Sequence, residues 1–541
     1  MTSTPPHGDS HAQRPSGAAA SDFAIELSKI NKHFGPVHAN KDIDLAVRRG
    51  SVHGIVGENG AGKSTLMSIL YGFYTADSGE IRVNDQLHAI TDSRHALALG
   101  IGMVHQHFML VDNFTILENV VLGAEDSAML GPSLSRARAE LTRLAKEYRL
   151  DVDPDAVIED VSVGTQQRVE ILKALYRGAD VLILDEPTGV LTPSEADDLF
   201  RVLRELRDQG KTIILITHKL REIMAITDYV SVMRQGAIVE TLKTSDTNPE
   251  QLAELMVGRR VLLRVEKGAP NPGKVLLSVE NLVVKDDLGV TRVKDVSFSV
   301  RAGEIVGIAG VAGNGQSELL ESISGMRDQT SGTVRLKDTP LSLEGDDGAH
   351  RARQAGLAHV PEDRQRMGLV TAFEEWENAI LGYQDDKAYG GFLLDLDAAR
   401  AQARERIQKF DIRPANERLK TANFSGGNQQ KIVLAREMER NPDVLIVGQP
   451  TRGVDIGAIE FIHNQIIKMR DAGKAILLVS VELDEIRSLS DRILVMFDGH
   501  IVGEADPATA TEGELGLMMA GINDGKAAAA PVRVVAEGGS S

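Results

Sequence analysis

Stretches of alternating and of continuous apolar residues recur along the chain, separated by glycine-rich turns and charged segments. Apolar and polar residues alternate over residues 23–27 and 43–47, which predicts two half-buried strands. Residues 181–184 and 213–216 are continuously apolar, as expected for strands covered on both faces. A charged segment near 133–150 has helical spacing. This alternation of buried strands with helices predicts an α/β protein.

The pattern of the first half is repeated in the second. Residues 303–317 resemble residues 50–64, and residues 425–430 resemble the segment that begins at Ser162. Two similar halves predict two similar domains. We expect a disordered tail (1–21), a first domain (22–262), a linker that contains two prolines (263–274), a second domain (275–523) and a flexible tail (524–541).

Length and charge narrow the possible functions. At 541 residues the chain is too long for one core. Its net charge of −18 opposes sequence-independent binding to nucleic acid, and the absence of cysteine excludes disulfides and thiolate metal sites. We find no apolar run of about 20 residues and no signal peptide. The chain is therefore expected in the cytoplasm, where any contact with a membrane goes through a partner.

A glycine-rich loop at residues 57–65 fits the phosphate-binding pattern G-x-x-x-x-G-K-[ST]. An apolar strand precedes it and a helical pattern follows, as that motif requires. Its backbone N–H groups and the helix dipole would face phosphate, Lys63 would reach the β- and γ-phosphates, and Ser64 would bind Mg²⁺. The spacing does not fit a dinucleotide fingerprint. The candidate residues are Gly57, Glu58, Asn59, Gly60, Ala61, Gly62, Lys63, Ser64 and Thr65.

Two carboxylates, Asp185 and Glu186, follow an apolar strand directly. The carboxyl ends of parallel strands face the ligand crevice, so we expect this pair beside the phosphates. Phe34, in the loop between the first two strands, has two open interpretations: an aromatic at the edge of the core, or a face on which adenine stacks. A zinc site at His105, His107 and the nearby His95 is disfavoured, because the residues after His107 are apolar and no carboxylate cluster is near.

With these motifs in order, the chain resembles the ATP-binding-cassette ATPases over about residues 22–523. Within that family it is similar to the fused double-cassette ATPases of bacterial sugar and nucleoside importers. The segments 103–110, 182–188, 311–318 and 449–455 look most like the nucleoside importers. The resemblance implies two tandem P-loop ATPase domains, each with a mixed sheet core and a helical subdomain.

The resemblance implies a role for each matching residue of the first half, with ATP and Mg²⁺ as cofactors. Glu186 polarises the attacking water and His218 contacts the γ-phosphate. Gln106, at the Q-loop position, senses Mg²⁺ and that water, and Phe34 stacks on adenine. These roles suit phosphoryl transfer, which depends on positioning and charge neutralisation. The implied metal-binding residues are Ser64, Gln106 and Asp185.

The second half departs from the family pattern at each catalytic position. Gln316 replaces the P-loop lysine, Gly448 and Gln449 replace the acidic pair, and Val481 replaces the γ-phosphate histidine. The Q-loop position is Glu362. Loss of a general base typically costs about 10²–10⁴-fold in rate, so we expect no useful hydrolysis there. We expect this second site to hold nucleotide weakly or passively, and the alternative is an empty site with a purely structural role.

Cassettes of this family pair head to tail, which implies that each P-loop faces the signature segment of the other half. The intact P-loop would face Ser425, Gly426, Gly427, Asn428 and Gln429. The degenerate one would face the segment at Ser162, where Val163 replaces a signature glycine and would hinder close approach to phosphate. One hydrolytic site per chain is expected.

The function implied is that of the ATP-hydrolysing subunit of a bacterial importer, for nucleosides first and simple sugars such as ribose or galactose second. Its partners would be two membrane-embedded permease subunits and an extracytoplasmic binding protein. The chain would lie at the cytoplasmic face of the inner membrane. Permease helices would dock near residues 107–110 and 364–369. The apolar character of the first of these segments also fits core packing. A soluble factor acting on ribosomes or nucleic acid is a remote alternative, disfavoured by the net charge.

Overall fold

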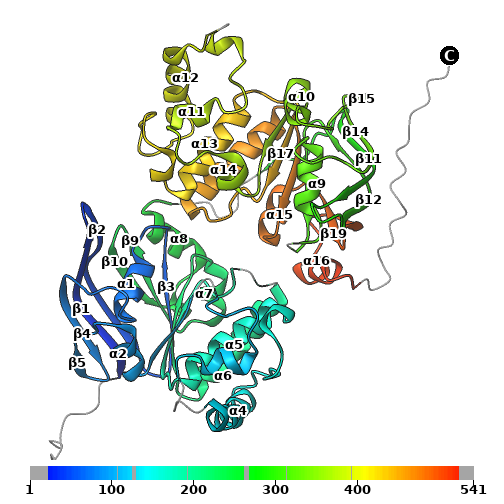
Figure 1. The fold of residues 1–541 in the computed structure, drawn as a ribbon. Coiled ribbons are helices and arrows are strands. Elements are labelled where there is room, and N and C mark those ends of the chain that lie inside the picture. Colours follow the sequence, from blue (N-terminus) through cyan, green and yellow to red (C-terminus); the bar gives the residue numbers. More distant parts are fainter. Residues whose placement is uncertain are drawn as a thin grey trace, which may run out of the picture.

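The computed structural model describes residues 22–105, 108–124, 130–189, 191, 193–260, 267–311, 313–390 and 393–522. Its two halves lie one above the other in Figure 1 and repeat one architecture. In the described residues, each half contains a four-stranded sheet and a six-stranded sheet. The strand orders are β2-β1-β4-β5 with β10-β9-β3-β8-β7-β6, and β12-β11-β14-β15 with β16-β17-β18-β13-β19-β20.

An antiparallel sheet opens the first half and lies at one side of the central sheet (Figure 1). The position predicted for Phe34 is wrong, because this residue ends a strand and only Gly35 and Pro36 separate the first two strands. The ladder register pairs Phe34 with Val37, which places the ring at the tip of a hairpin, 41% exposed. The strands are β1 (Phe23–Phe34), β2 (Val37–Arg48), β4 (Ser78–Val83) and β5 (Gln86–His88).

The central sheet of the first half is mixed, as predicted. All its neighbouring strands are parallel except β10, which runs antiparallel to β9. The interior strands are almost entirely buried, which explains why their sequences are continuously apolar. The strands are β3 (Val52–Gly57), β6 (Ile101–Val104), β7 (Val181–Asp185), β8 (Thr212–Ile216), β9 (Tyr229–Arg234) and β10 (Ala237–Lys243).

Helices cover this sheet, and three of them (α3, α4 and α5) pack on one another as a helical subdomain. Thr115 and Glu118 form a reciprocal capping box at the start of α3. The helices are α1 (Lys63–Leu70), α2 (Ser93–Ala98), α3 (Ile116–Val121), α4 (Leu130–Glu147), η1 (Ile158–Asp160), α5 (Val163–Tyr176), α6 (Pro193–Asp208), α7 (Leu220–Ile226), η2 (Thr244–Asp246) and α8 (Pro249–Val257).

The second half has the same plan. Its strands are β11 (Val275–Lys285), β12 (Thr291–Arg301), β13 (Glu304–Ala309), β14 (Ser331–Leu336), β15 (Thr339–Pro340), β16 (Leu357–Val360), β17 (Val444–Gly448), β18 (Ala475–Ser480), β19 (Arg492–Phe497) and β20 (His500–Ala505). Its helices are α9 (Gln316–Ile323), α10 (Gly348–Ala355), η3 (Arg364–Gly368), α11 (Glu375–Ala379), η4 (Lys387–Tyr389), α12 (Leu396–Lys409), η5 (Thr421–Asn423), α13 (Gly426–Met438), α14 (Ile456–Asp471), α15 (Leu483–Leu489) and α16 (Glu512–Met519).

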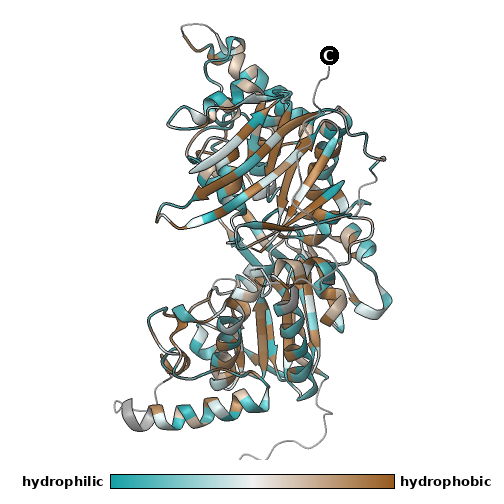
Figure 2. Ribbon diagram, turned by 90° about the vertical axis from the view of Figure 1, so that its right-hand side faces the viewer, coloured by the Kyte–Doolittle hydropathy of each residue, from teal (hydrophilic) through white to brown (hydrophobic). Residues whose placement is uncertain are grey.

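Each half has apolar clusters on both faces of its central sheet, and Ile456 of the second half packs into one cluster of the first half. Figure 2 shows the hydrophobic residues gathered on the strands and the hydrophilic ones on the outer sides of the helices. Separate cores are expected for a chain of this length. None of the helices in the described ranges combines the length and the apolar character that a membrane span needs.

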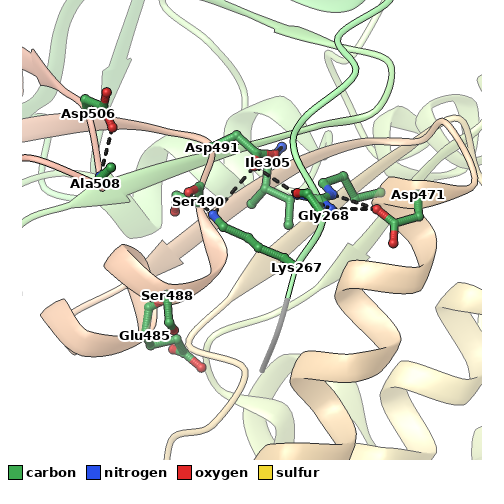
Figure 3. A network of polar contacts seen from close by, with 11 residues as sticks. Lys267, Gly268, Ile305, Asp471, Glu485, Ser488, Ser490, Asp491, Asp506 and Ala508 are labelled. Carbon is green, nitrogen blue, oxygen red and sulfur yellow. Dashed lines mark hydrogen bonds and ion pairs between the residues drawn. The ribbon is translucent and has the colours of Figure 1, made fainter. Parts of the chain in front are cut away.

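Residues 267–274, the described end of the predicted linker, are tied to the second half (Figure 3). Lys267 donates to the carbonyl of Ser490 and lies 3.5 Å from Asp491. Arg470 donates to the carbonyl of Gly268 at 3.1 Å and to Asp491 at 2.9 Å. Asp491 also accepts the backbone N–H of Ile305 at 2.9 Å. One buried carboxylate therefore joins the linker, α14 and β13.

We expect Asp491→Asn to destabilise the second half by about 3 kcal/mol, because it removes the buried carboxylate paired with the guanidinium of Arg470, which is 2% exposed. The remaining carboxylate partner, Asp471, is 56% exposed. The matched control is Asp228→Asn. Asp228 makes the same contacts in the first half, with Arg207 and the N–H of Val52, but that ion pair is more exposed. Denaturant unfolding of both variants measures the difference. Equal losses would show that burial of the Arg470 pair adds nothing.

Burial raises the pKa of Glu375, in α11, to about 8. The side chain is 1% exposed, and its Oε2 atom has no hydrogen-bond partner among the described residues. The folded pKa lies above the unfolded one, so stability falls as the pH rises towards 8. Glu375→Gln should therefore stabilise the protein by about 3 kcal/mol more at pH 9 than at pH 6. Thermal unfolding at both pH values tests this, and a gain independent of pH would contradict it.

Candidate nucleotide-binding site

The glycine-rich loop joins the end of β3 to the start of α1, as the motif predicts. Gly62 has φ 99°, and a Cβ there would lie 2.3 Å from the carbonyl oxygen of Ala39, so only glycine fits. The Lys63 side chain is 6% exposed, and its Nζ donates to the carbonyl of Gly57 at 2.7 Å. The lysine therefore folds over the loop, where it can reach a phosphate.

The carboxylate pair lies where β7 and β8 end side by side. Asp185 is the last residue of β7 and pairs in register with Ile216 at the end of β8. Glu186 follows with φ 47°, a left-handed conformation that L-residues seldom adopt. Glu186 Oε1 and His218 Nδ1 lie 2.9 Å apart. The register of two parallel strands thus brings together residues that are far apart in the sequence.

The electrostatics of the pair differ between its two members. Burial, and then the charge of Glu186, raise the pKa of Asp185, which also accepts a hydrogen bond from Ser64. The hydrogen bond from His218 is the main cause that lowers the pKa of Glu186. Glu186 is therefore kept ionised and oriented, which suits a group that polarises water.

These residues line one cavity of about 840 Å³, within the range of ligand pockets. It brings together the predicted residues Phe34, Asn59, Gly60, Gly62, Lys63, Ser64, Thr65, Asp185, Glu186 and His218. Gly57, Glu58 and Ala61 belong to the loop but do not line the cavity. The ring of Phe34 packs edge to face with Tyr74 at 5.1 Å between centroids. Gln106 lies outside the described residues.

The second half completes the cavity at Gly453, which the sequence reasoning missed. Asn59 Nδ2 donates to the carbonyl of Gly453 at 3.3 Å, and the carboxylate of Glu58 accepts the backbone N–H of Gly457. The sequence does contain a signal for this residue. Gly453 comes shortly after Gly448 and Gln449, which stand at the positions of the acidic pair of the first half. The head-to-tail pairing of the two halves predicted from the family also requires a contact between the first P-loop and the second half.

The signature residues lie behind Gly453 and do not line the cavity. Ser425 caps α13, accepting the backbone N–H of Asn428 at 3.4 Å. A Cβ on Gly426 would lie 2.9 Å from the carbonyl oxygen of Gly453. Gly427 and Gln429 are buried in the first turn of the same helix. The second half thus presents Gly453 to the cavity and the signature helix one layer further back.

A P-loop between a buried strand and a helix, beside an oriented carboxylate, defines a P-loop ATPase. The repeated pair of sheets gives the chain two cassettes. The chain belongs to the ABC transporter family, whose model matches residues 40–189 and 293–452.

Three curated relatives match over nearly their whole length. The chain is 47% identical to the nucleoside import ATP-binding protein NupA of Lactococcus lactis subsp. cremoris (93% of this chain, 99% of the relative). It is 48% identical to the guanosine import ATP-binding protein NupO of Bacillus subtilis (92% and 98%). It is 43% identical to the glucose import ATP-binding protein TsgD13 of Haloferax volcanii (96% and 99%).

Proposed function

We propose that this chain is the ATP-hydrolysing subunit of a nucleoside importer. The cavity that joins the P-loop to Glu186 and His218 carries the proposal for ATP hydrolysis. The nucleoside assignment is supported by the two nucleoside-import relatives. Import of a simple sugar is the second candidate, favoured by the glucose-import relative at 43% identity.

The residues of the first site fit Mg²⁺·ATP. The hydroxyl of Ser64 and the carboxylate of Asp185 are paired, and both are oxygen donors of the kind Mg²⁺ prefers. Bound there, with Gln106 as a further predicted ligand, the ion would neutralise charge on the phosphates. Lys63 would hold the β- and γ-phosphates. Glu186 would orient the attacking water and accept its proton, and His218 would contact the γ-phosphate.

A membrane-embedded permease pair and an extracytoplasmic binding protein would complete the importer. Met109, just after the Q-loop position, suits docking because its side chain is 57% exposed while its backbone is fixed. Its N–H donates to Glu170 at 2.8 Å, and its carbonyl accepts Lys173 Nζ at 2.7 Å. Leu369 of the second half is buried, which favours core packing there. We propose that the chain binds the cytoplasmic face of the inner membrane through these partners.

Uptake of labelled guanosine, ribose and glucose by cells that lack this chain tests the proposal. Loss of guanosine uptake that is restored by the wild-type chain supports it. Loss of ribose or glucose uptake alone would show that the chain serves a sugar importer. If all three substrates enter normally, the nucleoside assignment and the sugar alternative are both wrong for these substrates.

A further inference from the structure

Two residues at equivalent positions of the two halves contact each other across the boundary between them. Lys219 directly follows His218, and Glu482 directly follows Val481, which stands at the position of His218. Each caps a short helix with nearly the same backbone angles, φ −85° and ψ 103° before α7 and φ −82° and ψ 106° before α15. Lys219 Nζ lies 3.0 Å from Glu482 Oε1, where α7 and α15 approach each other (Figure 1). Equivalent residues meet only near a two-fold axis, so the axis that relates the halves passes close to this ion pair.

The pair attracts because the two halves differ in sequence. On the axis between two identical halves, a charged residue would face its own copy and repel it. Here one half supplies an ammonium group and the other a carboxylate. Two further ion pairs join the described parts of the halves with the same polarity, Arg221 with Glu512 at 2.8 Å and Arg259 with Glu460 at 2.8 Å. At these contacts the first half is cationic and the second half anionic.

Lys219 belongs to the loop that carries His218. Its backbone N–H donates to Thr217 Oγ1 at 3.0 Å, and the N–H of Thr217 donates to the carbonyl of Ile55 at 3.3 Å. The loop between β8 and α7 is thus short and is tied to β3. His218 Nδ1 lies 2.9 Å from the Glu186 carboxylate. A displacement of Lys219 would therefore move His218 relative to Glu186.

The charge of Lys219 also acts on two carboxylates of its own half. The hydrogen bond from His218 is the main cause of the lowered pKa of Glu186, and the charge of Lys219 acts in the same direction. Burial raises the pKa of Glu222, while its hydrogen bond from Thr188 and the charge of Lys219 oppose that rise. Glu222 is 5% exposed, and Thr188 lies two residues after Glu186. The position of this ammonium group therefore affects the acidic groups around the hydrolytic centre.

We propose that Lys219 is a positioning residue for ATP hydrolysis at the first site and that Glu482 of the second half holds it in place. The pair ties the loop that carries His218 to the other half, so the alignment of His218 with Glu186 depends on contact between the halves. This inference rests on the proposed function and adds a contact by which the second half controls the first, separate from Gly453. The two side chains are 30% and 52% exposed, so the pair should add little to stability and its effect should appear in turnover.

The test compares one charge reversal in two backgrounds of the full-length chain. In the wild-type chain, Glu482→Lys brings two ammonium groups together and should lower kcat by about tenfold, with the KM for ATP within about twofold of wild type. In a Lys219→Glu chain, the same substitution restores a pair of opposite charges and should raise kcat. The sign of the effect should therefore change with the background, whatever Lys219→Glu does alone. Asp484→Lys, the same reversal at an exposed position of the first turn of α15, is the matched control and should leave kcat near the wild-type value.

A second measurement does not depend on hydrolysis. A carbodiimide joins an ammonium group and a carboxylate that are in contact through an amide bond. It should link the peptides that contain Lys219 and Glu482 in the wild-type chain and not in Glu482→Gln, as read by mass spectrometry after digestion. Melting curves of the variants should match the wild type, which shows that a lower kcat does not come from unfolding.

The outcomes separate this inference from the proposed function. The positioning proposal is wrong if the link does not form, if Glu482→Lys leaves kcat of the wild-type chain unchanged, or if it lowers kcat equally in both backgrounds. If the wild-type chain forms the link but hydrolyses no ATP, the proposed function fails and the role in hydrolysis fails with it, although the ion pair itself is confirmed.

Discussion

Glu186→Gln is expected to lower the rate of ATP hydrolysis by about 10²–10⁴-fold while the chain still binds ATP. The reason is local, because the substitution keeps the shape of the side chain and removes the group that accepts a proton from water. In the wild-type chain this group is the Glu186 carboxylate, whose Oε1 lies 2.9 Å from His218 Nδ1. The second half cannot compensate, because Gln449 already stands at the corresponding position. Transport of the substrate should stop with hydrolysis.

Steady-state phosphate release gives the turnover number, and binding of labelled ATP gives the affinity. A drop in turnover with ATP binding retained assigns Glu186 to the chemical step. Glu159→Gln, the same change at an exposed position of η1, is the matched control and should hydrolyse ATP at the wild-type rate. Near-normal turnover in Glu186→Gln would mean that another group accepts the proton.

Local chemistry made much of the first half predictable. The P-loop, the strand that ends in Asp185 and the helix after Ser162 are each coded by contiguous residues, and each forms the element that its sequence predicts. The misplacement of Phe34 has a physical cause. The run from Phe23 continues as a strand through register irregularities, and a simple alternation of apolar residues does not reveal these.

Contacts between distant segments were harder to predict. Gly453 reaches the cavity only because the halves face each other, which no local pattern encodes. Glu362 and Gly448 depart from the family pattern separately in the sequence, and only the neighbouring positions of β16 and β17 show that one fills the space left by the other. The sequence predicts a degenerate second site from the replaced residues alone, but the packing of Glu362 against Gly448 depends on side-chain placement.

Gly426→Ala is expected to lower ATP turnover at the first site by about 10²-fold, although the residue lies in the other half. A methyl group there would lie 2.5 Å from Nη2 of Arg364 and 2.9 Å from the carbonyl oxygen of Gly453. Arg364 also donates to the carbonyl of Arg452 at 2.7 Å. The methyl group would therefore displace the segment that holds Asn59 and closes the cavity.

The control is Gly164→Ala, in the first turn of the corresponding helix of the first half, next to Val163, which occupies the position of Gly426. A Cβ on Gly164 would meet Glu195 Oε1 at 2.7 Å, the far end of a flexible side chain that can move aside. The predicted pairing also places this helix opposite the second site, so turnover should stay within a few-fold of wild type. ATPase assays of the two alanine variants, with melting curves to confirm folding, therefore measure which signature serves the hydrolytic site. Equal losses would mean that both composite sites hydrolyse ATP, and no loss in Gly426→Ala would mean that Gly453 does not have to stay in place for catalysis.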